Sequence, residues 1–277
     1  MIKLAKNNPI IKDIKELQKK TVNDLVYVDD LSSIKTIEGT NNVIDTFIYC
    51  DELQYHDDTK KLIDALIKKA HHSYTISKQT YEYLRQKENT AGLICTVLFK
   101  NHILDDFKNK EFIVVCDRLE IPGNIGTIYR TMDATKAEAM ILVDAVVKPQ
   151  SAKLALASRG ANFLLPTASA SYKETVKWLL ENNYTIFLGE PNLGKSYREY
   201  NYQGKIAIVV GSERFGINPD WYNHKHEKVF IPMYGSNNSL NVGVAASILI
   251  YEATMRRKKN KLGFSPSFLF FRIIKSS

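Results

Sequence analysis

EFIVVCDRLEIPGNIGTIYRTMDA, residues 111–134, is the stretch of this sequence that decides the fold. Its first seven residues are mostly apolar, as in parallel strands that are buried on both faces. Pro122 and Gly123 then predict a tight turn, and residues 124–134 have the apolar spacing of a helix. A strand that passes through a glycine-containing turn into a helix is the repeating unit of α/β proteins with parallel sheets.

The same alternation of strands and helices continues toward the C-terminus. The predicted strands are 139–144, 184–189, 205–211 and 228–233, and the predicted helices are 151–160, 171–182 and about 240–257. We therefore expect an α/β fold with a mostly parallel sheet over residues 111–262, and a ligand site at the carboxyl ends of its strands. For the apolar tail 263–277 the sequence predicts no definite role.

The N-terminal part of the chain alternates in the same way. The predicted helices are 1–20, 31–39 and 60–72, and the predicted strands are 25–28, 43–50, 73–77 and 92–99. An α/β unit of this size is large enough to fold as a domain of its own, so we expect an N-terminal domain over residues 1–105. The polar segment 100–110 is the best candidate for a linker.

The composition limits the class of protein. Of the 277 residues, 44% are hydrophobic and 25% are charged, which is ordinary for a globular protein in water. No apolar run approaches the roughly 20 residues that span a bilayer, and the charged start is not a secretory signal. Cys50, Cys95 and Cys116 are far apart and odd in number, which favours reduced thiols over disulfides or zinc. We expect a cytoplasmic protein without a membrane partner.

The net charge of +8 is unevenly distributed along the chain. Residues 1–110 have 17 basic and 16 acidic side chains, whereas residues 111–277 have 21 and 14. Much of the excess lies in one run, which contains Arg256, Arg257, Lys258, Lys259 and Lys261. Such a run suits a polyanionic partner, but it equally suits the solvated C-terminal end of a helix.

Residues 189–196, GEPNLGKS, match the phosphate-loop pattern GxxxxGK[ST] after a predicted strand. In such a loop Lys195 would reach the terminal phosphate and Ser196 would bind magnesium. The loop should open a long helix, yet the segment that follows is short and aromatic and ends at Gly204. We therefore predict a surface loop, with a nucleotide hydrolase as a remote alternative.

Two histidines in a polar loop raise the question of a metal site. His224 and His226 have no cysteine or acidic partners at ligand spacing. We therefore expect them to be exposed, and we expect no metal ion.

Three separated segments have the residues that a reaction would need. The first places Asn124 and Arg130 on the helix after the turn, where the exposed helix start suits an anion. The second is GSERFG (211–216), a strand end with glycines that let a ligand approach the backbone. The third is IPMYGSNNSLNVGVAA (231–246), in which a polar loop leads into a helix. Each segment alone also has a purely structural explanation, such as helix capping or a solvated arginine.

Together these segments resemble the SpoU/TrmH branch of the SPOUT RNA methyltransferases. That family has the motifs N-x-G-x-x-x-R, G-S-E-x-x-G and I-P-M…S-L-N-V…A, which stand here as NIGTIYR (124–130), GSERFG and IPMYGSNNSLNVGVAA. The resemblance covers about residues 111–257. ASRGANFLLP (157–166), VDDLSSIKTIEG (28–39) and ENTAGLICTV (88–97) are more loosely similar to the thiostrepton-resistance type of 23S rRNA ribose methyltransferase, which has a ribosomal-protein-like RNA-binding domain at its N-terminus.

The resemblance implies a fold, a cofactor and partners. The C-terminal domain would contain a trefoil knot and act as a homodimer, and S-adenosylmethionine would bind in the knot without a metal ion. The substrate would be RNA and not DNA, with 23S rRNA favoured and tRNA as the alternative. The cofactor would be held mainly by the backbone of Leu188, Gly189, Gly211, Ile231, Met233, Ser239 and Leu240. A catalytically silent RNA-binding protein is a further alternative.

The resemblance also implies roles at a ribose 2′-hydroxyl, which is a poor nucleophile. A guanidinium has a pKa above about 12 and is a poor base, so we expect Arg130 to bind the adjoining phosphate and orient the hydroxyl. Asn124 and Asn241 would position the nucleotide or the loop. Glu213 would fix the architecture of the site, and Ser239 would form a hydrogen bond near the cofactor.

Overall fold

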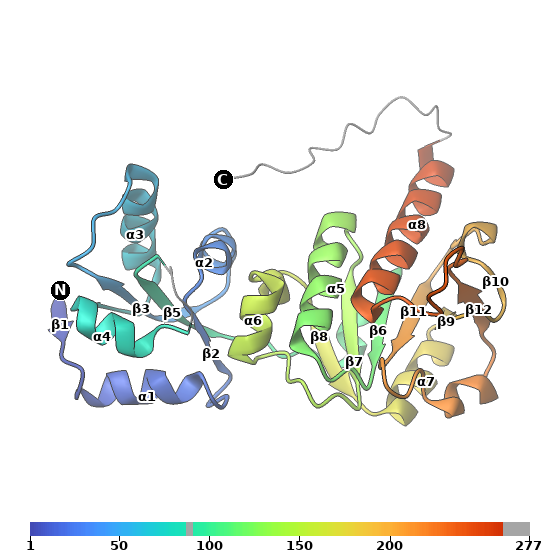
Figure 1. Ribbon diagram of the computed structural model, residues 1–277, viewed down its shortest axis with the longest axis horizontal. Helices are drawn as coiled ribbons and strands as arrows, with labels where there is room; N and C mark the ends of the chain where they lie inside the picture. The colour runs from blue at the N-terminus through green and yellow to red at the C-terminus, as the bar shows by residue number, and fades with distance from the viewer. Residues whose placement is uncertain (87–90, 263–277) are drawn as a thin grey trace.

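Each half of the chain forms its own sheet in the computed structural model, which describes residues 1–86 and 91–262 (Figure 1). The first sheet has five strands in the order β1-β4-β3-β5-β2, and the second has seven in the order β10-β12-β9-β11-β6-β7-β8. The α/β class with a mostly parallel sheet is therefore confirmed. The predicted tail 263–277 and part of the segment 88–97 lie outside the described residues.

The N-terminal sheet is mixed. Its strands are β1 (Ile2–Leu4), β2 (Leu25–Val28), β3 (Ile44–Cys50), β4 (His72–Ile76) and β5 (Leu93–Leu98). Strands β1, β4 and β3 are parallel, whereas β5 runs antiparallel to both β3 and β2. All four strands predicted in this half are present, and β1 is the additional one.

The helices of this half are α1 (Pro9–Leu17), α2 (Leu31–Glu38), α3 (Asp57–Lys69) and α4 (Lys78–Leu84). The prediction of one helix over residues 1–20 was wrong at its start. Residues 2–4 pair with β4, and α1 begins only at Pro9, after the Asn8 side chain accepts a hydrogen bond from the amide of Ile10 (2.9 Å). Helix α4 was not predicted.

The C-terminal sheet is parallel throughout. Its strands are β6 (Phe112–Asp117), β7 (Ala139–Val143), β8 (Thr167–Ala170), β9 (Thr185–Glu190), β10 (Lys195–Ser196), β11 (Ile206–Gly211) and β12 (Glu227–Phe230). The five predicted strands are confirmed, whereas β8 and β10 were missed. Because the strands are parallel, their carboxyl ends meet at one edge of the sheet.

Helices cover both faces of this sheet. They are α5 (Pro122–Thr135), α6 (Ala152–Ser158), α7 (Tyr172–Glu181) and α8 (Val242–Leu262). Helices α5 and α8 share one apolar core with alternate residues of the strands, and α7 belongs to the core on the other face. The predicted starts of α5 and α8 were each wrong by two residues. Helix α5 begins at Pro122 and not at residue 124, since proline suits the first helical position, and α8 begins at Val242 and not at residue 240.

Segment 100–110, which was predicted as a linker, connects the two halves but is itself folded. It contains a 3₁₀ turn at Leu104–Phe107. The Phe107 side chain is fully buried in the core on the α7 face, and the indole Nε1 of Trp178 donates to Asp105 Oδ1 (3.1 Å). The segment therefore packs with the second sheet.

Helix α6 lies between the two halves in Figure 1. Ala155 belongs to the apolar core of the N-terminal sheet, and its carbonyl accepts a hydrogen bond from the Ser33 hydroxyl (3.3 Å). Gly160 has φ +82°, and a β-carbon there would lie 2.9 Å from the Cα of Ser33. The two halves are thus packed directly against each other across α6.

Candidate active site

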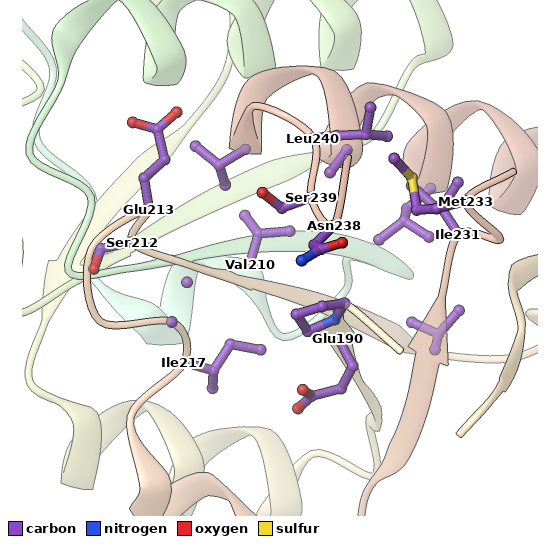
Figure 2. A pocket seen from close by; sticks show the side chains of 18 residues that line it. Glu190, Val210, Ser212, Glu213, Ile217, Ile231, Met233, Asn238, Ser239 and Leu240 are labelled. Carbon is purple, nitrogen blue, oxygen red and sulfur yellow. The ribbon is translucent and has the colours of Figure 1, made fainter. Parts of the chain in front are cut away.

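A cavity of ≈ 320 Å³ opens at the carboxyl ends of β9, β11 and β12 (Figure 2). Its lining comes from residues 189–191, 210–217, 229–240 and 242–249. These segments are the ends of three neighbouring strands, the loops after them and the first turns of α8. The cavity therefore occupies the position at which open parallel sheets bind their ligands, and its volume is within the range of small-molecule pockets, about 300–1,000 Å³.

The lining contains six of the seven residues that were predicted to hold a cofactor. They are Gly189, Gly211, Ile231, Met233, Ser239 and Leu240. Leu188 is not among the lining residues, because side chains alternate along a strand and that of Leu188 is fully buried in the core on the α7 face.

Gly211 is required by close backbone contact. A β-carbon at this position would lie 2.2 Å from the carbonyl carbon of Gly216 and 2.2 Å from the amide nitrogen of Ile217. The loop that follows β11 folds back tightly here, with Ser212 and Gly216 paired in an antiparallel bridge. Any larger residue would displace this wall of the cavity.

Asn241 joins the three sequence motifs through its side-chain amide. Its Nδ2 donates to Asn124 Oδ1 (3.0 Å) and to Glu213 Oε1 (2.6 Å). Its Oδ1 accepts from the backbone amides of Gly243 (3.0 Å) and Val244 (3.3 Å), which caps the start of α8. Asn124, Glu213 and Asn241, here called the polar cluster, are therefore brought together beside the cavity, as the motifs predicted.

The polar cluster leaves specific atoms available to a substrate. All the hydrogen-bonding groups of the Asn241 amide have partners, so this residue acts on its neighbours. Within residues 1–86 and 91–262, Asn124 Nδ2 and Glu213 Oε2 have no hydrogen-bond partner. The amide nitrogen of Asn124 therefore has free donors, and Glu213, which lines the cavity, has a free acceptor.

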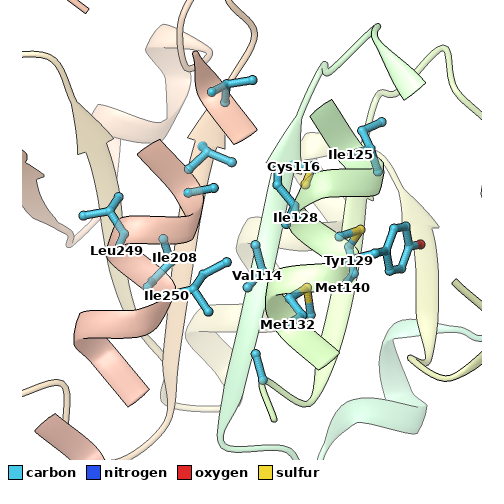
Figure 3. Packing of buried hydrophobic residues seen from close by; sticks show 14 of the residues in the cluster. Val114, Cys116, Ile125, Ile128, Tyr129, Met132, Met140, Ile208, Leu249 and Ile250 are labelled. Carbon is cyan, nitrogen blue, oxygen red and sulfur yellow. The ribbon is translucent and has the colours of Figure 1, made fainter. Parts of the chain in front are cut away.

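Helix α5, which carries Asn124, and helix α8, which Asn241 caps, share a common core (Figure 3). Ile125 and Ile128 of α5 and Leu249 and Ile250 of α8 are buried against the β6–β11 face of the sheet. A β-carbon on Gly243 would lie 3.2 Å from Thr127 Cβ, which shows how closely the helices approach. This contact sets the distance between Asn124 and Asn241.

The structure does not bring Arg130 into the polar cluster of its own chain. Arg130 is exposed, and it makes no ion pair or hydrogen bond with any other described residue. Six residues separate it from Asn124, which corresponds to about 9 Å along the axis of α5 and to a different side of the helix. Ser239, by contrast, lines the cavity next to Leu240 in Figure 2.

Two acidic residues near the cavity were missed by the sequence interpretation. Glu190 lines the cavity and accepts a hydrogen bond from the Tyr222 hydroxyl. Asp117 is fully buried at the end of β6, and its Oδ2 accepts from the amide of Asn218 (2.6 Å), which anchors the loop after β11. Burial raises the pKa of the Asp117 carboxyl. An acidic residue directly at the end of an apolar strand was the signal in both cases.

The phosphate-loop pattern does not form a phosphate site. Lys195 and Ser196 form the short strand β10, which pairs with β12 and is followed by a three-residue 3₁₀ turn. A β-carbon on Gly194 would lie 1.9 Å from the carbonyl oxygen of Lys228, so this glycine packs against a neighbouring strand. In the described part of the chain, no group of three or more His, Cys, Asp and Glu side chains is placed to hold a metal ion.

Arg256 and Arg257 of the basic run have structural partners. Arg256 Nε donates to Glu252 (2.7 Å) and its Nη2 to the carbonyl of Arg198 (2.9 Å). Arg257 pairs with Glu111 (2.8 Å). Both arginines therefore tie α8 to its surroundings, and of the described side chains in this run only Lys258 and Lys259 are exposed. No helix among the described residues is long and apolar enough to cross a membrane.

Comparison with known proteins adds independent evidence. A putative TrmH family tRNA/rRNA methyltransferase of Staphylococcus epidermidis is 30% identical over 193 residues, which is 66% of this chain and 77% of that protein. The 23S rRNA (guanosine(2553)-2′-O)-methyltransferase RlmP of Bacillus subtilis is 23% identical over 90% of this chain and 97% of its own. The crystal structure of an AdoMet-bound rRNA methyltransferase from Sinorhizobium meliloti superimposes with a TM-score of 0.81 at 22% identity, and covers 94% of this chain and 98% of that one.

The model of the SpoU rRNA methylase family matches residues 111–251, which are just over half of the chain. The match begins at β6 and ends within α8, so it includes all three motifs, the cavity and the polar cluster. On this evidence the chain belongs to the SpoU rRNA methylase family.

Proposed function

We propose that this protein transfers a methyl group from S-adenosylmethionine to a ribose 2′-hydroxyl of RNA, and that the RNA is 23S rRNA. The observation that carries the proposal is the polar cluster, in which Asn241 joins the three motifs beside the cavity. The Bacillus subtilis relative, which aligns with nearly the whole chain, is named for 2′-O-methylation of 23S rRNA. A catalytically silent RNA-binding protein would not need free polar atoms at this place.

The cavity suits S-adenosylmethionine by its chemistry. Ile231, Met233 and Leu240 provide an apolar surface for an adenine ring, and the glycine-containing strand ends expose backbone groups for hydrogen bonds. The carboxylates of Glu190 and Glu213 stand at its edge, where they would favour a cationic ligand. When bound, S-adenosylmethionine supplies an electrophilic methyl group on its sulfonium.

The residues of the polar cluster would align the acceptor hydroxyl. Asn124 Nδ2 would donate to the target nucleotide, and Glu213 Oε2 would accept from it, while Asn241 holds both side chains in place. Ser239 would hydrogen-bond near the cofactor. We assign Arg130 to the phosphate next to the target ribose, where its permanent charge orients the hydroxyl without accepting its proton. The methyl group passes to the 2′-oxygen, S-adenosylhomocysteine is released, and the proton of the hydroxyl leaves to the phosphate or to water.

We propose that the protein acts as a homodimer. Val244, Ile248, Tyr251 and Met255 are spaced by four, three and four residues, and form an apolar stripe along the outer face of α8. Val244 is 45% exposed and Met255 is 37% exposed, so the stripe is not covered within one chain. A second copy that packs on it would bury these side chains, and the absence of partners for Arg130 within its own chain fits a site that is completed across a dimer.

Further parts of the proposal concern the chain path, the N-terminal half and the cellular location. We propose that the chain is knotted around the cofactor; the support is that α8 is tied by Arg256 and Arg257 to the segment between β9 and β11. An experimental structure that traces this crossing would test it.

We further propose that residues 1–105 form an RNA-binding domain of the ribosomal-protein type, and that residues 111–262 form the catalytic domain. We also propose that the protein works in the cytoplasm.

The decisive experiment is a map of 2′-O-methylated nucleotides in total RNA from cells with and without the protein. We expect one or a few marks in 23S rRNA that disappear with the protein and return when it is supplied. Marks only in tRNA would refute the proposed substrate, and methylation of a base would refute the reaction. Calorimetry supplies a second test, in which S-adenosylmethionine should bind and ATP should not.

A further inference from the structure

The start of the chain concentrates positive charge in an otherwise balanced domain. Residues 1–20 contain six lysines and two acidic residues, although residues 1–110 together have a net charge of only +1. Lys12 and Lys15 lie on α1, and Lys19 lies in the turn that follows it, at spacings of three and four residues. This spacing places the three ammonium groups along one face, opposite the buried Ile14 and Leu17.

Two of the lysines lie over an exposed aromatic ring. Tyr83 of α4 is 38% exposed, and the Nζ atoms of Lys6 and Lys15 lie 4.8 and 5.0 Å from the centroid of its ring. Lys15 also donates to the carbonyl of Tyr83 (2.6 Å). Burial lowers the pKa of the Lys15 ammonium, and nearby Lys19 lowers it further. We call Lys6, Lys12, Lys15, Lys19 and Tyr83 the α1 lysine face.

These cations are not neutralised by carboxylates. Within the described ranges 1–86 and 91–262, Lys6, Lys12 and Lys19 form no ion pair, whereas the neighbouring Lys20 pairs with Glu16 (2.9 Å). Unpaired lysines around an aromatic ring are the combination that binds the phosphates and bases of a nucleic-acid strand. A solvated helix face would account for Lys12 and Lys19, but not for the two ammonium groups of Lys6 and Lys15 over one exposed ring.

The α1 lysine face and the cavity lie on the same side of the molecule. The Thr21 hydroxyl, two residues after Lys19, donates to the carbonyl of Gln150 (3.3 Å). Gln150 belongs to the loop that follows β7, and the carboxyl end of β7 lies beside those of β6 and β11 in the parallel sheet. Figure 1 shows α1 along the lower edge of the molecule and α8 beginning on that side. Lys148, in the same loop as Gln150, is exposed.

We propose that the α1 lysine face binds the substrate RNA, with phosphates on its lysines and an unpaired base stacked on Tyr83. The strand continues over the loop of Lys148 to the cavity. This inference rests on the proposed function, in that the substrate is RNA. The inference assigns the phosphate contacts to the start of the chain and not to the basic run of α8. The two arginines of that run are already engaged in ion pairs and in hydrogen bonds to carbonyl groups.

A pair of matched double variants tests the lysines. Lys12→Ala with Lys19→Ala removes two charges seven residues apart from the α1 lysine face. Lys61→Ala with Lys68→Ala removes two exposed charges at the same spacing from α3, on the upper side of Figure 1. The affinity for an unmodified 23S rRNA transcript is measured by filter binding over a range of salt concentrations. We expect the α1 pair to weaken binding about tenfold and to lower the log–log salt slope by about 1.5, and the α3 pair to do neither.

A second pair of variants tests the ring. Tyr83→Phe keeps an aromatic face, and we expect affinity close to that of the wild type; Tyr83→Leu removes it, and we expect a loss of about tenfold. Calorimetric binding of S-adenosylmethionine should stay unchanged in all variants, which shows that their C-terminal half is folded; unchanged urea unfolding curves show the same for the N-terminal half. Equal affinities of the α1 and α3 pairs would overturn the α1 lysine face as an RNA site. A wild-type protein that does not bind the transcript would overturn the proposed substrate, and this inference with it.

Discussion

At the scale of single residues, one amide organises the candidate site. Asn241 holds Asn124 and Glu213 with its Nδ2 and caps α8 with its Oδ1, so the start of the helix and the geometry of the polar cluster depend on the same side chain. Because no atom of this amide is left over, its contribution to a reaction is positional. Asn124 and Glu213, each with a free polar atom, are the residues that can contact a substrate.

Substitutions at Asn241 separate its two roles. Asn241→Asp keeps the capping oxygen but faces the Glu213 carboxylate with a second carboxylate, whereas Asn241→Ala loses both interactions. We expect the alanine variant to be destabilised by about 1 kcal/mol through loss of the cap, and the aspartate variant to be destabilised less. Both should lose most of their methyl transfer from tritiated S-adenosylmethionine to RNA. Full activity of the aspartate variant would show that the contact with Glu213 is dispensable.

Asp117 makes stability depend on pH. Burial raises the pKa of its carboxyl in the folded state, so the folded protein holds this proton more tightly than the unfolded chain does. Its contribution to stability is therefore fully present below the unfolded pKa, about 3.9, and is lost as pH rises through the folded pKa.

The side-chain amide of the Asp117→Asn variant would not ionise, and its oxygen would still accept from the amide of Asn218. We compare the unfolding free energy of Asp117→Asn with that of the wild type at each pH. We expect the variant's value minus the wild-type value to rise by on the order of 1 kcal/mol from pH 4 to pH 7. A constant difference in urea titrations at the two pH values would contradict this.

At the scale of elements, apolar runs predicted the buried strands correctly, and short polar strands escaped prediction. Strands β6, β7, β9 and β11 were predicted from runs of consecutive apolar residues. Such runs are typical of strands that are buried on both faces of a sheet. Strand β8 has the sequence TASA and β10 has only two residues, so their extended form comes from pairing with β7 and β12. Local sequence does not encode such pairing.

The polar cluster shows the same limit for the site. Asn124 and Asn241 are 117 residues apart in the sequence and meet only because α5 and α8 pack closely. The family motifs identified them, although neither periodicity nor composition did. Family motifs also included Arg130, yet the geometry of one chain leaves it apart from the polar cluster. The motifs therefore predicted the contact between Asn124 and Asn241 correctly, but they did not predict that Arg130 lies apart from it.

Close packing of α5 on α6 provides a prediction with a control in the same helix. A β-carbon on Gly126 would lie 2.6 Å from the carbonyl carbon of Ala157, whereas one on Gly123 would meet only Ile121, at 3.9 Å. We expect Gly126→Ala to reduce the unfolding free energy by about 1–3 kcal/mol, because α5 and α6 must separate. Gly123→Ala should leave it nearly unchanged. Urea unfolding of both variants is the measurement, and equal stability of the two would show that the helices can adjust.

At the scale of the whole molecule, α6 and the residues after it fix the N-terminal half relative to the C-terminal sheet. Gly160 and Ala155 are packed against Ser33, and the side chain of Asn42 donates to the carbonyl of Phe163 (3.0 Å). With these contacts in place, an RNA bound at the start of the chain is held at a set distance from the cavity.

The apolar stripe of α8 leads to a prediction about the oligomeric state of the protein. A buried carboxylate without a partner is strongly unfavourable at an interface, so Ile248→Glu should dissociate the proposed dimer. The chain has a mass of 31.6 kDa. We expect light scattering to give twice this mass for the wild type and the single-chain mass for Ile248→Glu. Ile103→Glu, which places the same charge at an apolar residue that is 67% exposed elsewhere, should stay dimeric.

The same variant connects the assembly to the reaction. If Arg130 completes the site of a second copy, Ile248→Glu should lose RNA methylation while its cavity still binds S-adenosylmethionine, since the lining residues come from one chain. Mixing inactive Arg130→Ala and Glu213→Ala proteins would then restore part of the activity, because a mixed dimer contains one site with both residues intact. No recovery in mixtures that exchange subunits would place Arg130 in its own chain's site and separate the dimer from catalysis.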